Sequence, residues 1–285
     1  MTTLIEASGL RKRYKSTEAL RGIDFNIQAG RIVGLIGPNG AGKTTALKAI
    51  LGLTEFEGQL QVLGHDPRAG REHMMRDVCF IADVAVLPRW LRVQQAIDFV
   101  SGVHSKFDLK RCEAFMARTQ IPRQARVREL SKGMIVQLHL ALVMAIDARF
   151  LVLDEPTLGL DLLYRKQFYQ TLLEDYFDEQ RTILITTHQV EEIEHILSDV
   201  MFIRDGRITL NADMESLGER FIEVMVAPEH DQDARGLNPL STRSVFGRSV
   251  HLFDGVPRER LQPLGELRRP GLADIFVATM QGAHA

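Results

Sequence analysis

The stretch Gly37–Thr45 constrains this chain of 285 residues more than any other, and it reads Gly-Pro-Asn-Gly-Ala-Gly-Lys-Thr-Thr. It follows an apolar run, Arg31–Ile36, that is typical of a buried strand, and it leads into Thr45–Leu51, which has helical spacing. Glycines allow backbone N–H groups to approach phosphate oxygens, and the helix N-terminus adds the positive end of its dipole. The stretch therefore predicts a phosphate-binding loop, with a glycine-rich turn that binds no ligand as the alternative.

Two side chains of this loop are expected to carry its chemistry. Lys43 is predicted to contact the β- and γ-phosphates as a point charge. The hydroxyl of Thr44 is predicted to ligate the magnesium ion that bridges these phosphates. The other predicted phosphate-binding residues of the loop are Gly37, Asn39, Gly40, Ala41, Gly42 and Thr45.

Two acids end a second strand, Phe150–Glu155, which is too uniformly apolar to have one wet face. Ligands of parallel sheets gather at the carboxyl ends of strands, so Asp154 and Glu155 should lie near the phosphates. Asp154 is expected to hold magnesium through water, and Glu155 to orient or deprotonate the attacking water. A capping pair before Pro156 is the alternative.

A further strand, Thr182–Thr187, should deliver His188 to the same edge of the sheet. A single histidine after a strand is usually structural. Its position here favours a contact with the γ-phosphate.

The region of residues 84–147 shows helical spacing of apolar residues, and it predicts an all-helical insertion with helices over Val93–His104, Leu109–Thr119 and Ser131–Ile146. Ser131 is a natural N-cap. Gly133 is expected to leave backbone N–H groups of the first turn uncovered, which would create a second anion site. Plain helix capping is the alternative.

The early part of the chain predicts strands over Leu4–Tyr14 and Ala19–Ile27, then a short strand over Gly58–Gly64 and a buried one over Val78–Ala82. Tyr14 could stack on a nucleotide base, although a lone tyrosine is more often part of a packed surface.

Composition excludes several classes. Lys and Arg number 35 against 37 Asp and Glu, so no global basic field indicates nucleic acid or anionic lipid as a partner. Cys79 and Cys112 lack metal-ligand spacing and favour a reduced, cytoplasmic compartment. The first residues lack signal-peptide features, and no apolar run approaches the ~20 residues that span a bilayer.

In this order, the signals resemble the ATP-binding cassette (ABC) ATPases that drive membrane transporters, over about residues 1–215. The resemblance implies an α/β fold: a P-loop, RecA-like core with an antiparallel β subdomain and a helical insertion. The matching segments are Tyr14 as the adenine-stacking aromatic, Gly37–Thr45 as Walker A, Leu130–Met134 as the signature, Phe150–Glu155 as Walker B, Leu158–Asp161 as the D-loop and His188 as the switch histidine. The flanking sequences look most like ATPase subunits of drug and antibiotic exporters.

The resemblance also implies ATP and Mg²⁺ as ligands and a head-to-tail homodimer, in which Ser131 and Gly133 face the phosphate loop of the other copy. It implies a separately encoded membrane-spanning subunit, which would hold this chain at the cytoplasmic face of the membrane. The competing hypothesis is a soluble cassette ATPase acting on nucleic acid or ribosomes. The chain has no long coiled coil, no second cassette and no basic face, so no nucleic-acid partner is expected. A P-loop kinase or GTPase would not need a Leu-Ser-Lys-Gly helix start.

The chain departs from the family pattern at several positions. Asp83 stands where the family usually has Gln. A carboxylate there would either add a hard oxygen ligand to the magnesium, which we favour, or cap the loop that enters the insertion. Lys132, Met134 and Leu158 also differ, beside contacts that the backbone makes.

Residues 216–285 predict a small α+β accessory domain, with a strand over Phe221–Val226, a hairpin around Gly247, and helices over Arg258–Leu267 and Leu272–Met280. The stretch Glu229–Asp233 is expected to be an exposed connector. The scattered histidines His230, His251 and His284 predict no site. In the insertion, the apolar loop Val84–Trp90 is a candidate docking patch for the membrane partner, with core packing as the alternative.

Overall fold

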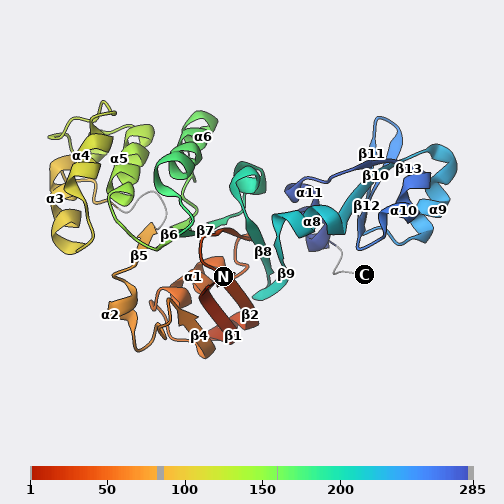
Figure 1. The fold of residues 1–285 in the computed structure, drawn as a ribbon, viewed down its shortest axis with the longest axis horizontal. Coiled ribbons are helices and arrows are strands. Elements are labelled where there is room, and N and C mark those ends of the chain that lie inside the picture. Colours follow the sequence, from red (N-terminus) through yellow and green to blue (C-terminus); the bar gives the residue numbers. More distant parts are fainter. Residues whose placement is uncertain (1, 82–86, 159, 282–285) are drawn as a thin grey trace.

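A six-stranded sheet forms the centre of the molecule (Figure 1). The computed structural model describes residues 2–81, 87–158 and 160–281. In spatial order, the strands of this sheet are β5 (Val78–Ile81), β6 (Phe150–Asp154), β7 (Thr182–Thr187), β3 (Ile32–Ile36), β8 (Asp199–Arg204) and β9 (Arg207–Asp213). All neighbours pair in parallel except β8 and β9. The carboxyl ends of β3, β6 and β7 therefore meet at one edge, as predicted.

A second, antiparallel sheet covers one face of the first. Its order is β2 (Thr17–Gln28), β1 (Thr3–Tyr14) and β4 (Glu57–Val62), and α1 (Lys43–Ile50) packs with it. Val33 and Leu35 of β3 point into this layer, whereas Ile32 and Ile36 belong to the core on the opposite face. Because β3 is buried on both faces, its sequence is continuously apolar.

Helices cover the other face of the central sheet. They are α5 (Lys132–Met144), α6 (Leu162–Thr171) with a π-helical extension over Leu172–Tyr176, and α7 (Val190–Ile193). The π-helical turn keeps Leu172 and Tyr176 buried. The sequence did not predict α2 (Arg71–Met74), α7 or the hairpin of β8 and β9, which also belong to the cassette.

The predicted helical insertion is present, and Figure 1 shows it grouped away from α1 and the three-stranded sheet. It consists of α3 (Val93–Val103), α4 (Leu109–Met116) and α5, which share a core of their own around Ile97, Cys112 and Leu138. Together with the sheets, it confirms the predicted α/β architecture.

The last part of the chain forms an antiparallel sheet of β11 (Ser241–Val245), β12 (Arg248–Asp254), β10 (Phe221–Val226) and β13 (Gly265–Arg268), with α8 (Met214–Arg220), α9 (Asp231–Gly236) and α10 (Arg258–Leu261). Val224, Phe253 and Leu261 are in its small core. The predicted strand Phe221–Val226 and the hairpin around Gly247 are confirmed.

Two predictions in this region are wrong. The helix expected over Arg258–Leu267 ends early, and β13 takes its place because Gly265 lies against β10, where an added Cβ would be 2.2 Å from the Met225 carbonyl oxygen. The connector expected at Glu229–Asp233 is helical instead. Asp231 begins α9 and is held there by an ion pair with Arg235 at i+4.

Helix α11 (Leu272–Gln281) forms where a helix was predicted, and it packs on the cassette. Phe276 contacts Phe202 of β8 edge to face, and Arg204 donates a hydrogen bond to the Met280 carbonyl oxygen. At the other end of α11, the Leu272 backbone N–H donates to Glu194 Oε1 at 2.9 Å. The expected division near residue 215 stays a proposal, because residues from both sides of it share this core.

Candidate nucleotide-binding site

The phosphate-binding loop lies between the carboxyl end of β3 and the start of α1. It lines a cavity of ≈ 220 Å³ together with Ala19 and Glu155. Gly42 has φ of 113° and an added Cβ there would lie 2.7 Å from the Ala19 carbonyl oxygen. At Gly37 the same atom would lie 2.3 Å from the Ile203 carbonyl oxygen. The glycines therefore let this loop fold tightly against β2 and β8.

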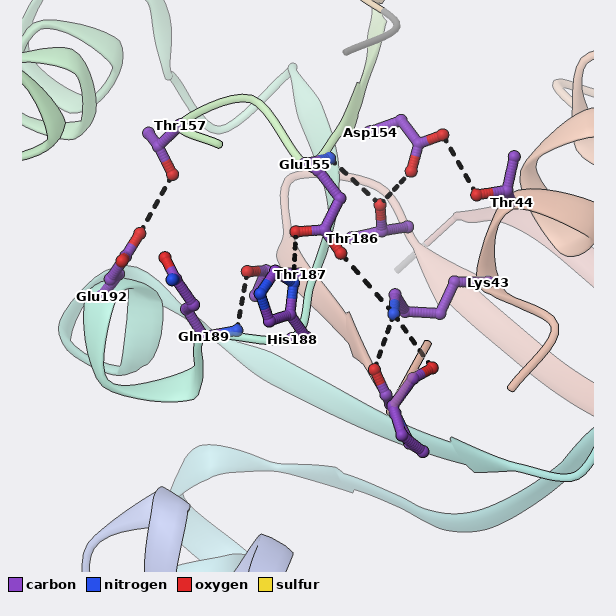
Figure 2. A network of polar contacts seen from close by, with 12 residues as sticks. Lys43, Thr44, Asp154, Glu155, Thr157, Thr186, Thr187, His188, Gln189 and Glu192 are labelled. Atoms are coloured by element: carbon purple, nitrogen blue, oxygen red, sulfur yellow. Dashed lines mark hydrogen bonds and ion pairs between the residues drawn. The ribbon is translucent and has the colours of Figure 1, made fainter. Parts of the chain in front are cut away.

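The ammonium group of Lys43 is buried at the centre of the site. It donates hydrogen bonds to the carbonyl oxygens of Gly37 at 2.6 Å and Pro38 at 3.3 Å, and Glu155 Oε1 lies 3.6 Å from it (Figure 2). The lysine is therefore fixed over its own loop by hydrogen bonds. A phosphate oxygen can replace these carbonyl contacts as a stronger, charged acceptor.

The Asp154 carboxylate lies between two hydroxyl groups. Thr44 Oγ1 donates to Asp154 Oδ2 at 3.3 Å, and Thr186 Oγ1 donates to Asp154 Oδ1 at 2.5 Å. Thr44 and Asp154 thus meet across the site, as the sequence predicted. Hard oxygen atoms at this spacing are the ligands that magnesium prefers, so the donor set fits Mg²⁺.

Glu155 follows Asp154 with its carboxylate directed at both His188 and Lys43. Its Oε2 is 2.9 Å from His188 Nδ1 (Figure 2). Glu155 has a φ of 48°, which is uncommon for a residue other than glycine and costs free energy. Its backbone N–H donates to the Thr186 carbonyl oxygen at 3.1 Å. The chain thus holds a strained backbone turn at the residue predicted to activate water.

A second polar cluster braces the segments that follow these strands. Glu192 accepts a hydrogen bond from Thr157 Oγ1 at 3.0 Å and forms an ion pair with Arg165. Arg165 also donates to Gln189 Oε1 at 2.8 Å. Tyr169 lies 3.2 Å from Thr157 Oγ1, and burial raises the pKa of its phenol well above the usual range, so the hydroxyl stays neutral. The cluster connects the segment after Glu155 to the segment after His188.

Comparisons with known proteins bear on this geometry. A sequence model of the family described as "ABC transporter" matches residues 20–158. A second model, of an AAA domain described as a putative AbiEii toxin of a type IV toxin–antitoxin system, matches residues 123–194. A "Nod factor export ATP-binding protein I" of Burkholderia thailandensis is 34% identical over 291 residues, which cover 96% of this chain and 95% of the relative. The "ABC transporter ATP-binding protein YtrB" of Bacillus subtilis is 29% identical over 80% of this chain and 78% of its own.

The chain belongs to the ATP-binding subunits of ABC transporters. Members of this family bind and hydrolyse ATP and work with transmembrane subunits. Solved structures agree on the fold: an "ATP binding subunit of ABC transporter" has a TM-score of 0.67 at 24% identity, covering 76% of this chain and 92% of its own. A bacterial Atm1-family ABC exporter with ATP bound has a TM-score of 0.66 at 18% identity, covering 77% of this chain and 40% of its own.

The residues that were predicted to form the signature, Ser131 and Gly133, lie apart from the phosphate loop. Ser131 caps α5 by accepting a hydrogen bond from the Met134 backbone N–H at 3.2 Å, and neither Ser131 nor Gly133 lines the cavity around Lys43. Gly133 is buried, and an added Cβ would lie 2.4 Å from Cζ of Tyr164. The expectation that no side chain covers this turn is therefore wrong, because the ring of Tyr164 lies against it.

Other predicted residues are placed less centrally. Tyr14 ends β1 and is partly exposed, with its hydroxyl 3.4 Å from Thr54 Oγ1 and the Lys12 ammonium 5.0 Å from its ring centroid. It does not line the cavity around the phosphate loop. Asp83 lies outside the described residues, as does Gly159 of the D-loop.

Thr186, Arg165 and Glu192 are among the residues of this edge that the sequence interpretation missed. A signal was available for the first. Thr186 has a hydroxyl group and lies in a fully buried strand, where a hydroxyl group needs a hydrogen-bond partner. The other two depend on how α6 and α7 pack, which local spacing does not reveal.

Proposed function

We propose that this chain is the ATPase subunit of an ABC exporter, and that it drives a separate membrane-spanning subunit from the cytoplasmic face of the membrane. The observation that carries the ATPase part is the convergence of Lys43, Glu155 and His188 beside the phosphate loop. The exporter assignment is supported by the relatives named for Nod factor export, which match nearly the whole chain.

Hydrolysis is explained by the positions of these three side chains. Lys43 neutralises charge on the γ-phosphate and keeps ATP in place. Glu155 orients the attacking water and accepts its proton, while His188 holds the Glu155 carboxylate through the 2.9 Å hydrogen bond. Thr44 and Asp154 would hold Mg²⁺, which supplies positive charge between the phosphates when bound.

The second half of the ATP site comes from another copy of the chain. The signature residues Ser131 and Gly133 do not line the cavity around Lys43 in their own chain. Leu158, which begins the predicted D-loop, is 44% exposed, and Leu162 and Leu163, which follow that loop, are 65% and 73% exposed. Exposed apolar side chains next to a site indicate an interface, so we propose a two-fold, head-to-tail dimer with ATP between the copies.

A mixing experiment tests this arrangement. The Lys43→Ala and Ser131→Arg variants should each have little ATPase activity alone. Mixed, they form heterodimers with one intact composite site, so activity should return. The matched control mixes Lys43→Ala with Glu155→Gln. In their heterodimer one site lacks Lys43 and the other lacks the Glu155 carboxylate, so no activity should return. Recovery in neither mixture would contradict the shared site.

Docking of the membrane partner is proposed for the outer surface of the helical insertion. Trp90 is 67% exposed, so the core-packing alternative for this residue does not hold. Phe99 and Val103 are also exposed and lie four residues apart on α3, while Val84, Ala85 and Val86 lie outside the described residues. Within the described residues, no helix has the length and apolar character needed to cross a bilayer.

Co-purification with the membrane subunit tests this surface. Trp90→Ala should reduce recovery of the complex while the isolated chain keeps its unfolding midpoint and basal ATPase activity. Phe246→Ala, which removes an exposed aromatic side chain from the β11–β12 turn, is the matched control. Equal recovery of both variants would rule out Trp90 as a docking residue.

A further inference from the structure

Thr186 is the last residue but one of β7, and it pairs with Asp154 in the parallel ladder of β6 and β7. Its side chain is completely buried. The neighbouring Thr187 serves a different purpose, because its hydroxyl accepts the Gln189 backbone N–H at 2.9 Å. Thr186 is therefore the hydroxyl of this strand that is directed at the two acids (Figure 2).

The hydroxyl of Thr186 has one proton and two lone pairs, and the structure uses both functions. The proton is donated to Asp154 Oδ1 at 2.5 Å. A lone pair accepts a hydrogen bond from the Glu155 backbone N–H, with an N···Oγ1 distance of 3.3 Å. The same N–H also donates to the Thr186 carbonyl oxygen. A single side chain thus contacts the carboxylate of one acid and the strained backbone of the next.

We propose that Thr186 is a positioning residue for the magnesium and water-activating acids, an inference that rests on the proposed function. With Oδ1 of Asp154 bonded to Thr186, the other oxygen, Oδ2, faces Thr44. This arrangement gives the metal an oriented carboxylate. Without the hydroxyl, the carboxylate can rotate about its last torsion, and one hydrogen bond to the backbone of Glu155 is lost.

The size of the effect follows from comparable contacts. Residues that orient metal ligands typically change metal affinity by about 10- to 100-fold when they are removed. Thr186→Val removes the hydroxyl while keeping a β-branched side chain of similar volume. Thr186→Ser keeps the hydroxyl. The contribution of the metal to nucleotide binding should therefore fall in the valine variant and survive in the serine variant.

The strand offers a matched control. Thr182 is also completely buried on β7, and its hydroxyl accepts the Gly30 backbone N–H at 3.0 Å, at the end of the strand away from the site. Thr182→Val should cost stability as Thr186→Val does, but it leaves both acids untouched. It separates a role in positioning from general damage to the strand.

The measurement is the Kd of a fluorescent, non-hydrolysable ATP analogue, determined in excess Mg²⁺ and again in EDTA. The Kd in EDTA divided by the Kd in Mg²⁺ reports how much the metal contributes to binding. This measurement requires no ATP turnover. We expect Thr186→Val to lower this ratio by roughly tenfold. Thr186→Ser and Thr182→Val should stay within about threefold of the unmodified chain, because both keep the contacts between Thr186 Oγ1 and the acids.

The outcomes separate this inference from the proposed function. No analogue binding by the unmodified chain, or an equal Kd with and without Mg²⁺, would contradict the proposed ATP–magnesium site itself. A normal ratio in the unmodified chain together with an unchanged ratio in Thr186→Val would overturn the positioning role alone. If Thr182→Val lowered the Kd ratio as much as Thr186→Val does, the positioning role of Thr186 would also be overturned.

Discussion

Two histidine–carboxylate pairs in this chain have nearly the same geometry and opposite surroundings. His188 Nδ1 lies 2.9 Å from Glu155 Oε2 beside the phosphate loop, and the histidine side chain is 34% exposed. His251 Nε2 lies 3.0 Å from Asp231 Oδ1 in the C-terminal sheet, and its side chain is 0% exposed. The other nitrogen of His251 is 2.9 Å from Thr242 Oγ1, so both ring nitrogens have partners within the chain.

The difference shows why a pair of residues does not by itself define a site. His188 keeps an accessible ring at the edge where three strand ends meet, next to a glycine-rich loop. His251 connects α9 to the hairpin of β11 and β12 and has no accessible surface for a ligand. Hydrogen bonds from Arg235, then His251 and Ser249, hold the pKa of Asp231 well below its usual range. Exposure and neighbours, rather than the pair, indicate chemistry in the first case and stability in the second.

The largest effect is expected at the exposed pair. His188→Ala should slow ATP hydrolysis by roughly 10²-fold or more, because Glu155 loses the group that orients it. The unfolding midpoint should hardly change, as a partly exposed side chain contributes little to packing. Steady-state ATPase assays and thermal unfolding measure both. His230→Ala, at an exposed histidine near Asp233, is the control, and equal turnover in both variants would break the comparison.

The buried pair should respond in the opposite way. His251→Ala leaves a cavity and removes two hydrogen bonds, so it should destabilise the C-terminal sheet by about 2–4 kcal/mol, as other large-to-small core substitutions do. ATP turnover at a temperature below unfolding should stay within about twofold, because the residue contacts nothing at the phosphate loop. Denaturant unfolding, followed by a probe in the C-terminal sheet, measures the destabilisation. A stable variant with impaired turnover would assign His251 a functional role.

A third histidine sharpens the comparison because its pKa shift has burial as its sole cause. His139 is buried in α5, and burial lowers the pKa of its imidazole to about 4. At pH values between about 4 and the unfolded pKa near 6.5, the unfolded chain binds a proton at His139 that the folded chain does not. Protonation of His139 therefore leaves the free energy of unfolding unaffected above about pH 6.5 and lowers it as the pH falls below that value. The loss should reach about 2 kcal/mol at pH 5. The free energy of unfolding of His139→Gln should therefore change less between pH 7 and pH 5 than that of the unmodified chain. An identical change in both chains would contradict the assignment of this pH dependence to His139.

The smallest effect is expected at the turn of the hairpin that carries His251. Phe246 is fully exposed with φ of 49°, and Gly247 follows with φ of 78°. Asparagine tolerates this backbone conformation better than phenylalanine, so Phe246→Asn should raise stability by about 0.5–1 kcal/mol without changing ATP turnover. Chemical denaturation resolves this difference. A destabilised variant would show that the exposed ring makes a contact that stabilises the hairpin.

The sequence predicted those features that depend on local spacing. The phosphate loop, the two acids and His188 lie at the ends of strands that contain apolar runs, and parallel strands bring these ends together. The helices of the insertion could also be predicted, because each is amphipathic or capped, as at Ser131.

What the sequence did not predict depends on register and on packing between distant elements. Thr186 reaches Asp154 because these residues are paired across two strands, 32 positions apart. Tyr164 covers Gly133 because α6 packs on α5. His251, which we interpreted as one of several scattered histidines, meets Asp231 only after β12 and α9 come together. Assignments of individual roles to the site residues remain predictions for the experiments above.

The return of α11 to the cassette has a consequence for the order in which the protein is made. Leu272, Ile275 and Ala278 belong to the same core as Ile32 and Leu151, although they follow Ile32 by 240 to 246 positions in the sequence. Chains fold from the N-terminus during synthesis. The sheets of the cassette can form early. On their helical face, however, Phe202 lacks its contact with Phe276 until residue 276 has been translated. If translation stalls within the C-terminal sheet, the ATPase domain would therefore expose an apolar face, and chaperones bind such faces.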